Sequence, residues 1–147
     1  MDNLSTKAVG QFVAFTGVQL ELGSVATDFE HRSYGEILAD CQRFYQQIGG
    51  QAYHRLLVGY AHSSVAQLST LRYSVTMRAA PTVSNTTVGN FSVLDSSGAH
   101  TVSALTHEYI TTDGHAINAT TSGINSGEAS ILRNISADGY IIMSAEL

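Results

Sequence analysis

Charged residues, cysteines and prolines are scarce in this chain of 147 residues. Only 13% of the residues are charged, about half of the share of roughly 25% that is usual in soluble domains. The formal net charge is −5, and the sequence contains no run of lysine or arginine. Composition therefore gives little electrostatic support for nucleic-acid binding. The surface must be formed largely by Ser, Thr, Asn, Gln and Gly side chains.

Three further absences narrow the class of protein. Cys41 is the only cysteine, so it cannot close a disulfide within the chain, and no metal-type Cys/His spacing surrounds it. No stretch approaches the ~18–20 apolar residues that cross a bilayer as a helix, so we expect no membrane insertion. Residues 1–10 lack the basic start and apolar block of a secretory signal. We expect a single domain made in the cytoplasm without a signal peptide.

Motifs typical of catalysis are also absent. The six histidines form no HxH, HxxxH or HExxH pattern, and there is no GxSxG, GxGxxG or Walker sequence. Acidic residues are few and scattered, and Asp113 and Asp138, each followed by glycine, are typical of turns. We therefore expect no enzyme, no catalytic residue, no cofactor and no metal site. A metal site would need side chains that the fold alone brings together.

The N-terminal part of the chain differs from the rest. Residues 9–22 alternate loosely between apolar and polar side chains, which predicts one extended strand. No hairpin partner follows this strand, and residues 23–32 are a polar joint. We interpret residues 1–32 as the end of an upstream module followed by a connection.

The next segment, residues 33–50, is predicted to be a helix that couples subunits. Ser33 and Glu36 have the spacing of a capping box. Apolar side chains then recur every three or four residues, and Gly49-Gly50 is expected to end the helix after residue 48. The apolar seam of this predicted helix consists of Tyr34, Ile37, Leu38, Cys41, Phe44, Tyr45 and Ile48.

A helix of this length needs a packing partner, because isolated helices under ~12–15 residues are marginal in water. Two arrangements fit the seam. Three copies of the helix could meet on a trimer axis, or each helix could lie on its own β-domain. We favour the axial bundle, and a monomer in solution would count against it.

From residue 51 onward the period of the pattern changes to two, which is typical of strands. Pro81 marks a strand end or an edge, and Asp113-Gly114 and Asp138-Gly139 predict turns. The fold prediction is mainly β, with an antiparallel β-sandwich of jelly-roll type over residues 51–147. The predicted strands are residues 55–62, 71–78, 82–88, 90–95, 101–112, 115–120, 129–136 and 140–147.

One candidate binding face follows from the predicted hairpin at Asp113-Gly114. A two-residue turn places Ile110 opposite Ile117 on the core side. The other side then carries aromatic and polar groups suited to stacking on sugars and hydrogen bonding with them. This predicted face consists of His107, Tyr109, Asn118 and Thr120. The simpler interpretation is that Tyr109 covers a sheet or a subunit contact.

Three stretches occur in a characteristic order: GVQLELGSVATDFEHRSYGEILADCQRFY at residues 17–45, SVTMRAAPTV at residues 74–83, and SAEL at residues 144–147. Together they resemble the C-terminal region of tail-fibre and other tail-associated adhesion proteins of tailed bacteriophages and prophages. The layout is similar over residues 11–147. One departure is Asp28, where that family commonly has proline, which loosens the joint.

The resemblance implies a virion protein of a fibre or its distal tip, and a homotrimer assembled with other tail proteins. We weigh three functions. The first is attachment to a receptor on the host bacterium, with a surface glycan as the expected target and avidity from three sites. The second is a connector or trimerisation module of the tail or baseplate. The third is a polysaccharide depolymerase, which the lack of paired carboxylates argues against.

Overall fold

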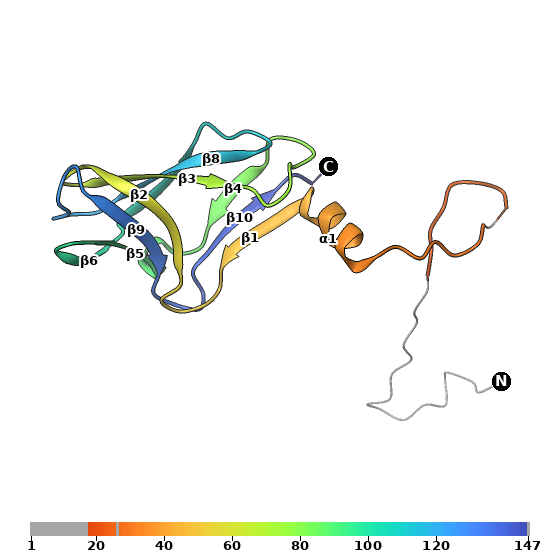
Figure 1. Ribbon diagram of the computed structural model, residues 1–147, viewed down its shortest axis with the longest axis horizontal. Coiled ribbons are helices and arrows are strands. Elements are labelled where there is room, and N and C mark those ends of the chain that lie inside the picture. Colours follow the sequence, from red (N-terminus) through yellow and green to blue (C-terminus); the bar gives the residue numbers. More distant parts are fainter. Residues whose placement is uncertain (1–17, 26, 147) are drawn as a thin grey trace, which may run out of the picture. The chain divides into compact units, whose positions relative to one another are not determined.

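The computed structural model describes residues 18–25 and 27–146 (Figure 1), and the chain divides into two units, Met1–Ser33 and Tyr34–Leu147. In the first unit, residues 18–22 form no strand, contrary to the prediction, while residues 9–17 lie outside the described residues. The carboxylate of Glu21 instead accepts hydrogen bonds from the backbone N–H and the hydroxyl of Thr27, at 2.6 and 2.5 Å. These bonds hold a polar loop, and they lower the pKa of Glu21.

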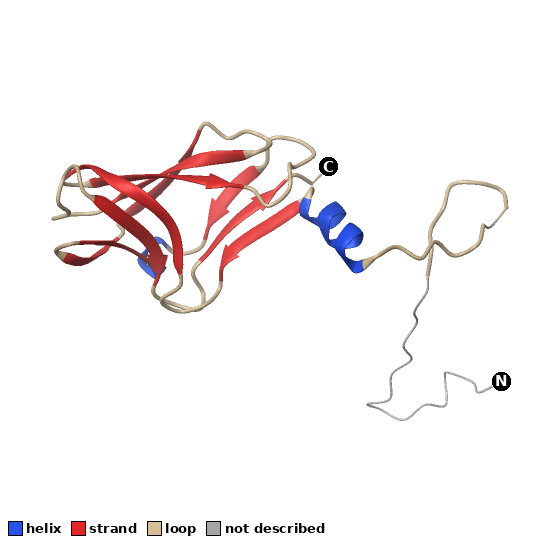
Figure 2. Ribbon diagram, in the orientation of Figure 1, coloured by secondary structure: helices blue, strands red, loops and turns tan. Residues whose placement is uncertain are grey.

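The second unit is mainly β, as predicted, and Figure 2 shows its strands and short helix. A 3₁₀ turn at Val88–Asn90 leads into the fifth strand. The elements in chain order are α1 (Tyr34–Gln42), β1 (Tyr45–Gly49), β2 (Arg55–Ser63), β3 (Ala66–Arg72), β4 (Thr82–Asn85), β5 (Phe91–Asp95), β6 (Gly98–Thr101), β7 (Ala104–Glu108), β8 (Gly114–Thr120), β9 (Ala129–Asn134) and β10 (Tyr140–Ser144).

The strands form two antiparallel sheets, consistent with the predicted sandwich. One sheet has the order β1-β10-β4, and the other has the order β6-β5-β9-β2-β3-β8-β7. Side chains from both sheets form one buried core, which includes Ile141 and Met143 from β10 and Phe91, Ile117 and Leu132 from the larger sheet. The jelly-roll connectivity stays a prediction.

The helix is shorter than predicted, and this expectation was wrong from Arg43 onward. It begins at Tyr34 but ends at Gln42, and residues 45–49 form β1 instead of a second half of the helix. The amide of Gln46 donates to the carbonyls of Gln42 (3.0 Å) and Val75 (2.8 Å) and accepts from the N–H of Ser74 (3.0 Å). These tertiary bonds and the pairing of β1 with β10 outweigh local helical propensity. No helix within residues 18–25 and 27–146 combines the length and apolar character of a membrane span.

The predicted strand at residues 71–78 is also wrong beyond Arg72, where β3 ends. The backbone N–H groups of Tyr73 and Met77 donate to the carbonyls of Asp113 and Thr112, at 3.0 and 2.9 Å. The segment therefore bonds to the loop between β7 and β8 and to the side chain of Gln46, and its backbone does not pair as a strand of either sheet. Its alternating side chains still bury Met77, which explains why the pattern looked like a strand.

The connection between β7 and β8 spans residues 109–113 and is longer than the predicted two-residue turn. Thr106 therefore lies opposite Asn118, and His107 lies opposite Ile117. The pairing differs from the prediction by three positions, and an odd shift exchanges the two faces of a strand. The predicted strand at residues 101–112 is also wrong in its bounds, because only Thr101, the last residue of β6, and Ala104–Glu108, which form β7, are in strands.

Candidate functional site

A groove runs along the outer face of the larger sheet, over β2, β3 and β8. It consists of two adjoining hollows of about 300 and 560 Å³, which share Thr70, Tyr109 and Ala116. The smaller hollow is lined in addition by Arg72, Thr111, Gly114 and His115. The larger hollow is lined in addition by Val58, Gly59, Tyr60, Leu68, Ser69 and Glu108.

The groove exists because β8 has small residues between two strands with larger ones. Gly114 lies opposite Arg72 of β3, and Ala116 lies opposite both Thr70 of β3 and Glu108 of β7. A Cβ on Gly114 would lie 2.3 Å from the carbonyl oxygen of Leu71, so this floor position accepts only glycine. The strand register therefore determines the shape of the groove, because it places small residues of β8 between larger residues of β3 and β7.

Two exposed tyrosines flank the larger hollow. Tyr109 follows β7 in the left-handed backbone region, with φ of 53°, and 83% of its surface is exposed. Among the described residues, its side chain has no hydrogen bond and no ring contact. Tyr60 of β2 is 51% exposed, and Val58 beside it is 75% exposed. Such exposed aromatic surface on a polar protein is suited to contact with a ligand or another chain.

The two ends of the groove differ in charge. Arg72 lines the smaller hollow, and no ion pair of its guanidinium occurs within residues 18–25 and 27–146. Glu108 lines the larger hollow, where its carboxylate accepts a long hydrogen bond of 3.4 Å from the Thr106 hydroxyl. A ligand in the groove would therefore meet a cation at one end and an anion at the other.

The structure does not bring the four residues of the predicted binding face together. Tyr109 lies in the groove, but it is in the connection and has no partner strand residue. Asn118 and Thr120 are on the outer face, opposite Thr106 and Ala104, and line neither hollow. His107 is on the inner face, because the odd register shift places it opposite the core residue Ile117.

Most of the groove residues were missed from the sequence. Val58 and Tyr60, like Thr70 and Arg72, are two residues apart on one strand, so each pair shares a face. That spacing was readable, but it does not reveal which strands are neighbours. The small residues of β8 were the other available signal.

A chain of hydrogen bonds links the two sheets behind the groove. The Tyr73 hydroxyl lies 2.9 Å from Nδ1 of His115, Nε2 of His115 lies 3.1 Å from Nδ1 of His107, and Nε2 of His107 lies 3.1 Å from Oδ1 of Asn85. Because Oδ1 of Asn85 can only accept, Nε2 of His107 must donate to it. When both imidazoles are neutral, every bond forms with each Nε2 donating and each Nδ1 accepting. The Tyr73 hydroxyl then donates.

The surroundings of this series of hydrogen bonds favour the neutral forms of its two histidines and its tyrosine. Burial lowers the pKa of His107, and burial together with the neighbouring His107 lowers the pKa of His115 to about 4. Burial also raises the pKa of Tyr73 to about 12. The bonds connect β4 of the smaller sheet to β7 and β8 of the larger one. We therefore assign these hydrogen bonds a role in holding the two sheets together.

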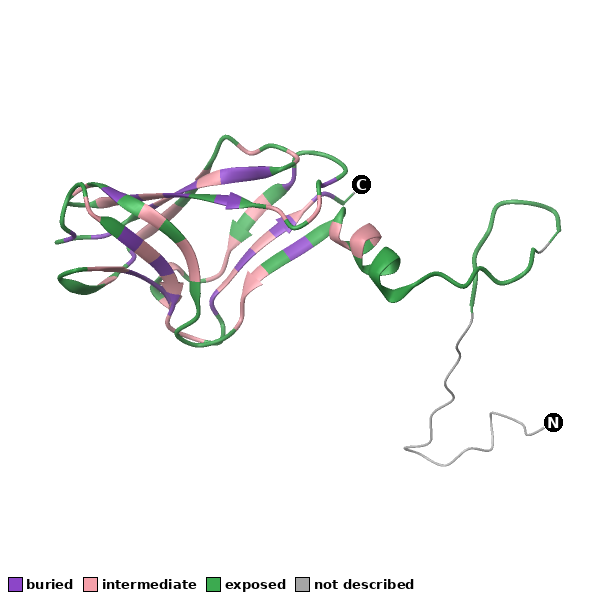
Figure 3. Cartoon of the chain, viewed as in Figure 1, coloured by how far each residue is buried: buried purple, intermediate pink, exposed green. Residues whose placement is uncertain are grey.

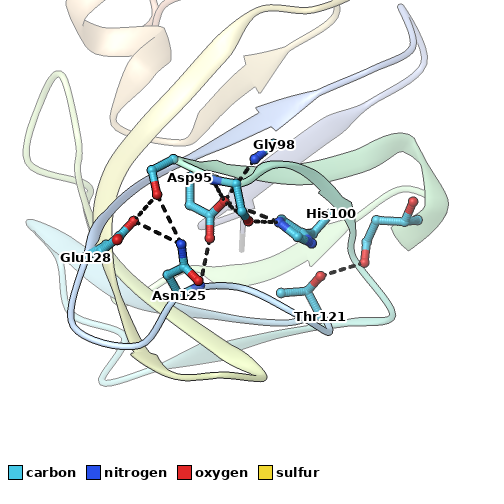
Figure 4. Close-up of polar contacts among 9 residues, drawn as sticks. Asp95, Gly98, His100, Thr121, Asn125 and Glu128 are labelled. Carbon is cyan, nitrogen blue, oxygen red and sulfur yellow. Dashed lines mark hydrogen bonds and ion pairs between the residues drawn. The ribbon is translucent and has the colours of Figure 1, made fainter.

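A second polar cluster surrounds Asp95 at the end of β5, and Figure 4 shows its contacts. The carboxylate accepts hydrogen bonds from the Ser97 hydroxyl (2.6 Å), the Ser97 N–H (2.8 Å) and the Asn125 N–H (2.7 Å), and lies 3.2 Å from Nε2 of His100. These donors, led by the Ser97 hydroxyl and the Asn125 N–H, hold the pKa of Asp95 well below its usual range. Because Ser97 is in the β5–β6 turn and Asn125 is in the loop before β9, the carboxylate joins these two segments.

The predicted helix seam is divided by the structure. Tyr34, Ile37, Leu38 and Cys41 lie on α1, which contains no buried residue, as Figure 3 shows. Phe44 and Tyr45 lie beyond the helix, partly exposed, and Phe44 packs against Arg78, whose guanidinium carbon is 5.4 Å from the ring centre. Ile48 is on β1 and packs against the core. The exposed apolar surface of α1 is therefore smaller than predicted.

Neither grouped metal ligands nor similarity to known proteins assigns a function to the described residues. Within the described ranges, no three His, Cys, Asp or Glu side chains are grouped as a metal site requires. Comparison of the chain with protein-family models, with curated proteins and with solved structures gave no match.

Proposed function

We propose that this chain is the distal domain of a trimeric tail-fibre-type adhesion protein of a tailed bacteriophage, and that it attaches to a saccharide on the host surface. The observation that carries the proposal is the groove between Tyr60 and Tyr109. Sugars bind by stacking a ring face on an aromatic side chain and by hydrogen bonding to polar groups beside it. Exposed tyrosines with Thr70, Glu108 and Arg72 nearby supply both kinds of group.

The shape of the groove suits weak binding by the grooves of several subunits together better than tight binding by a single groove. It is open along the sheet surface, so a bound sugar stays partly in water, and each site alone would be weak. Three sites on one fibre tip give avidity without a deep pocket. The resemblance of residues 17–45, 74–83 and 144–147 to tail-fibre sequences supports the trimer and the virion location.

The exposed helix supports the oligomeric part of the proposal. In a single chain α1 buries none of its residues, and Tyr34, Ile37 and Leu38 remain exposed. Apolar helix surface of this kind is covered by a partner in stable assemblies. Of the two arrangements left open by the sequence, a contact with other copies accounts for this exposure, whereas packing on its own β-domain does not.

The proposal is tested by adsorption of the purified chain to bacterial cells and by binding to a panel of surface polysaccharides. We expect saturable binding, and we expect Ala116→Phe to abolish it, because the added ring fills the floor of the groove. Ala99→Phe is the matched control, since Ala99 is an exposed residue of the edge strand β6 outside the groove. It should bind as the unaltered chain does.

Two outcomes would contradict the receptor role. One is the absence of binding to every cell and polysaccharide at saturating concentration. The other is equal binding by Ala116→Phe and the unaltered chain, which would place the contact elsewhere. Release of reducing ends from a bound polysaccharide would show a depolymerase instead of a binding protein.

A connector or trimerisation module of the tail is the second candidate. The exposed apolar surface of α1 favours it, because that surface suits assembly and not recognition. Under this hypothesis Tyr60, Tyr109 and Val58 would lie in a contact between subunits. Loss of the trimer in Ala116→Phe, with no saccharide bound by either form, would support the connector.

A further inference from the structure

The charge of the groove indicates which class of saccharide it would take. Its smaller hollow contains one cationic side chain, Arg72, and no acidic residue lines that hollow. The chain as a whole has only seven lysines and arginines against twelve acidic residues. The guanidinium of Arg72 therefore lines a concave site and has no ion pair within residues 18–25 and 27–146.

The backbone fixes the place of Arg72 on the groove side. Thr70 and Arg72 are two residues apart on β3, so both project from the outer face, while Leu71 between them is buried in the core. Arg72 lies opposite Gly114, and both residues line the smaller hollow. The hydroxyl-bearing residues Thr70 and Thr111 line the same hollow.

These groups match the needs of an anionic group on a sugar. Arginine presents a planar set of N–H donors that binds a carboxylate or a phosphate through two parallel hydrogen bonds. Threonine hydroxyls can donate to the remaining oxygens. Tyr109, which lines both hollows, offers an aromatic face to the sugar ring that carries the anion.

Glu108 gives the groove a direction. It lies opposite Ala116, one outward-facing position further along β8 than Gly114, which lies opposite Arg72. A carboxylate at this place repels an anion from the larger hollow and accepts hydrogen bonds from sugar hydroxyls there. The acidic substituent is thereby directed to Arg72 and the neutral part of the saccharide to Tyr60 and Glu108.

We propose that the groove selects acidic saccharides, with Arg72 binding a carboxylate or phosphate substituent of a sugar stacked on Tyr109. This inference rests on the proposed saccharide-binding function and adds the ligand class. The carboxylate of a uronic or sialic acid and the phosphate of a sugar phosphate offer the same chemistry to Arg72. Separate probes distinguish these two sources.

The test measures affinity by titration calorimetry for three matched pairs of probes: trigalacturonate with galactotriose, sialyllactose with lactose, and mannose phosphate with mannose. We expect the acidic member of at least one pair to bind more tightly than its neutral partner. Arg72→Gln should weaken that acidic probe by about tenfold, the scale of a hydrogen bond to a charged group. It should change the neutral partner by less than about twofold, since the neutral sugar lacks the group that Arg72 binds.

Two further variants separate a local contact from a general charge effect. Arg55→Gln removes the same charge from an exposed position of β2 outside the groove, and acidic binding should stay unchanged. Glu108→Gln removes the repelling carboxylate, so acidic binding should become tighter by about twofold to threefold, within the range for partly screened charges.

The outcomes distinguish this inference from the proposed function. Neutral saccharides bound as tightly as acidic ones, with Arg72→Gln without effect, would overturn the acidic preference and leave saccharide binding intact. Equal losses from Arg72→Gln and Arg55→Gln would show a nonspecific charge effect and also overturn it. If no probe and no polysaccharide of the panel binds, the proposed function fails, and this inference fails with it.

Discussion

The two faces of β8 (Gly114–Thr120) differ in how far their side chains are buried and bonded within the chain. On the inner face, His115, Ile117 and Ala119 are buried, and His115 has a hydrogen-bond partner on each ring nitrogen. On the outer face, Gly114 and Ala116 form the floor of a groove. One strand of seven residues therefore has a buried face on one side and an open surface with aromatic, polar and charged neighbours on the other.

This difference separates residues that hold the fold from residues available for contact. Inner-face residues contribute burial and hydrogen bonds within the chain, so their replacement should change stability. The outer-face groove has exposed tyrosines and an arginine without an ion pair in the described part of the chain. Replacement of these exposed side chains should leave stability nearly unchanged and alter binding.

The largest expected effect is on the inner face. Ile117→Ala removes a fully buried side chain and leaves a cavity between the sheets, which should lower the free energy of unfolding by about 2–5 kcal/mol. Thr120→Ala, an exposed outer-face position of the same strand, should change it by no more than about 0.5 kcal/mol. Urea unfolding of both variants checks the comparison, and similar losses would contradict the division between faces.

The next effect concerns acid. Burial keeps the pKa of His107 and of His115 below the ordinary value of 6.5, to about 4 for His115. The unfolded chain therefore binds these protons first. Stability should be fully present above pH 6.5 and should fall as the pH decreases toward 4. Protonation of both imidazoles would also place two N–H groups against each other between His107 Nδ1 and His115 Nε2.

Unfolding measured between pH 7 and about pH 5.5, above the range where most carboxylates titrate, checks this expectation. In His115→Gln, the decline of stability with acid should be shallower, because the side chain no longer titrates. His54→Gln replaces an exposed histidine and should keep the original slope. A slope that is the same in all three proteins would show that the buried histidines do not set it.

A smaller effect on the single chain, but a decisive one on assembly, is expected at α1. Ile37→Asp replaces an exposed apolar residue, so the stability of one chain should change by less than about 0.5 kcal/mol. If other copies cover the helix, the variant should lose the trimer in sedimentation or light scattering. A trimer that persists in Ile37→Asp would place the subunit contact elsewhere.

Local sequence patterns predicted those helices and strands that can be recognised without knowing which segments they pack against. The capping pair Ser33 and Glu36 gave the start of α1 correctly, and period-two alternation identified β2, β5, β8, β9 and β10 to within a few residues. The mainly β class follows from these strands. Each of these signals depends on backbone preference and on one buried face, both of which are readable along the chain.

Long-range contacts decided the rest. The amide of Gln46 bonds to Ser74 and Val75, which ended the helix early, and nothing near Gln46 in sequence indicates those partners. The connection at residues 109–113 bonds to the segment after β3, which changed the register by three positions and moved His107 to the inner face. Of the predicted binding residues, Tyr109 alone lies in the groove.

The central claim is that the groove contacts a saccharide, and two tyrosines provide the most direct test. Tyr109 and Tyr53 are both exposed and both left-handed, with φ of 53° and 60°. Tyr53 lies outside the groove and packs against Arg133, at 5.5 Å from the ring centre. The measurement is the affinity of Tyr109→Ala and Tyr53→Ala for the polysaccharide that the unaltered chain binds. We expect at least about tenfold weaker binding for Tyr109→Ala, on the scale of one lost stacking contact, and unchanged binding for Tyr53→Ala. Equal affinity of both variants would contradict it.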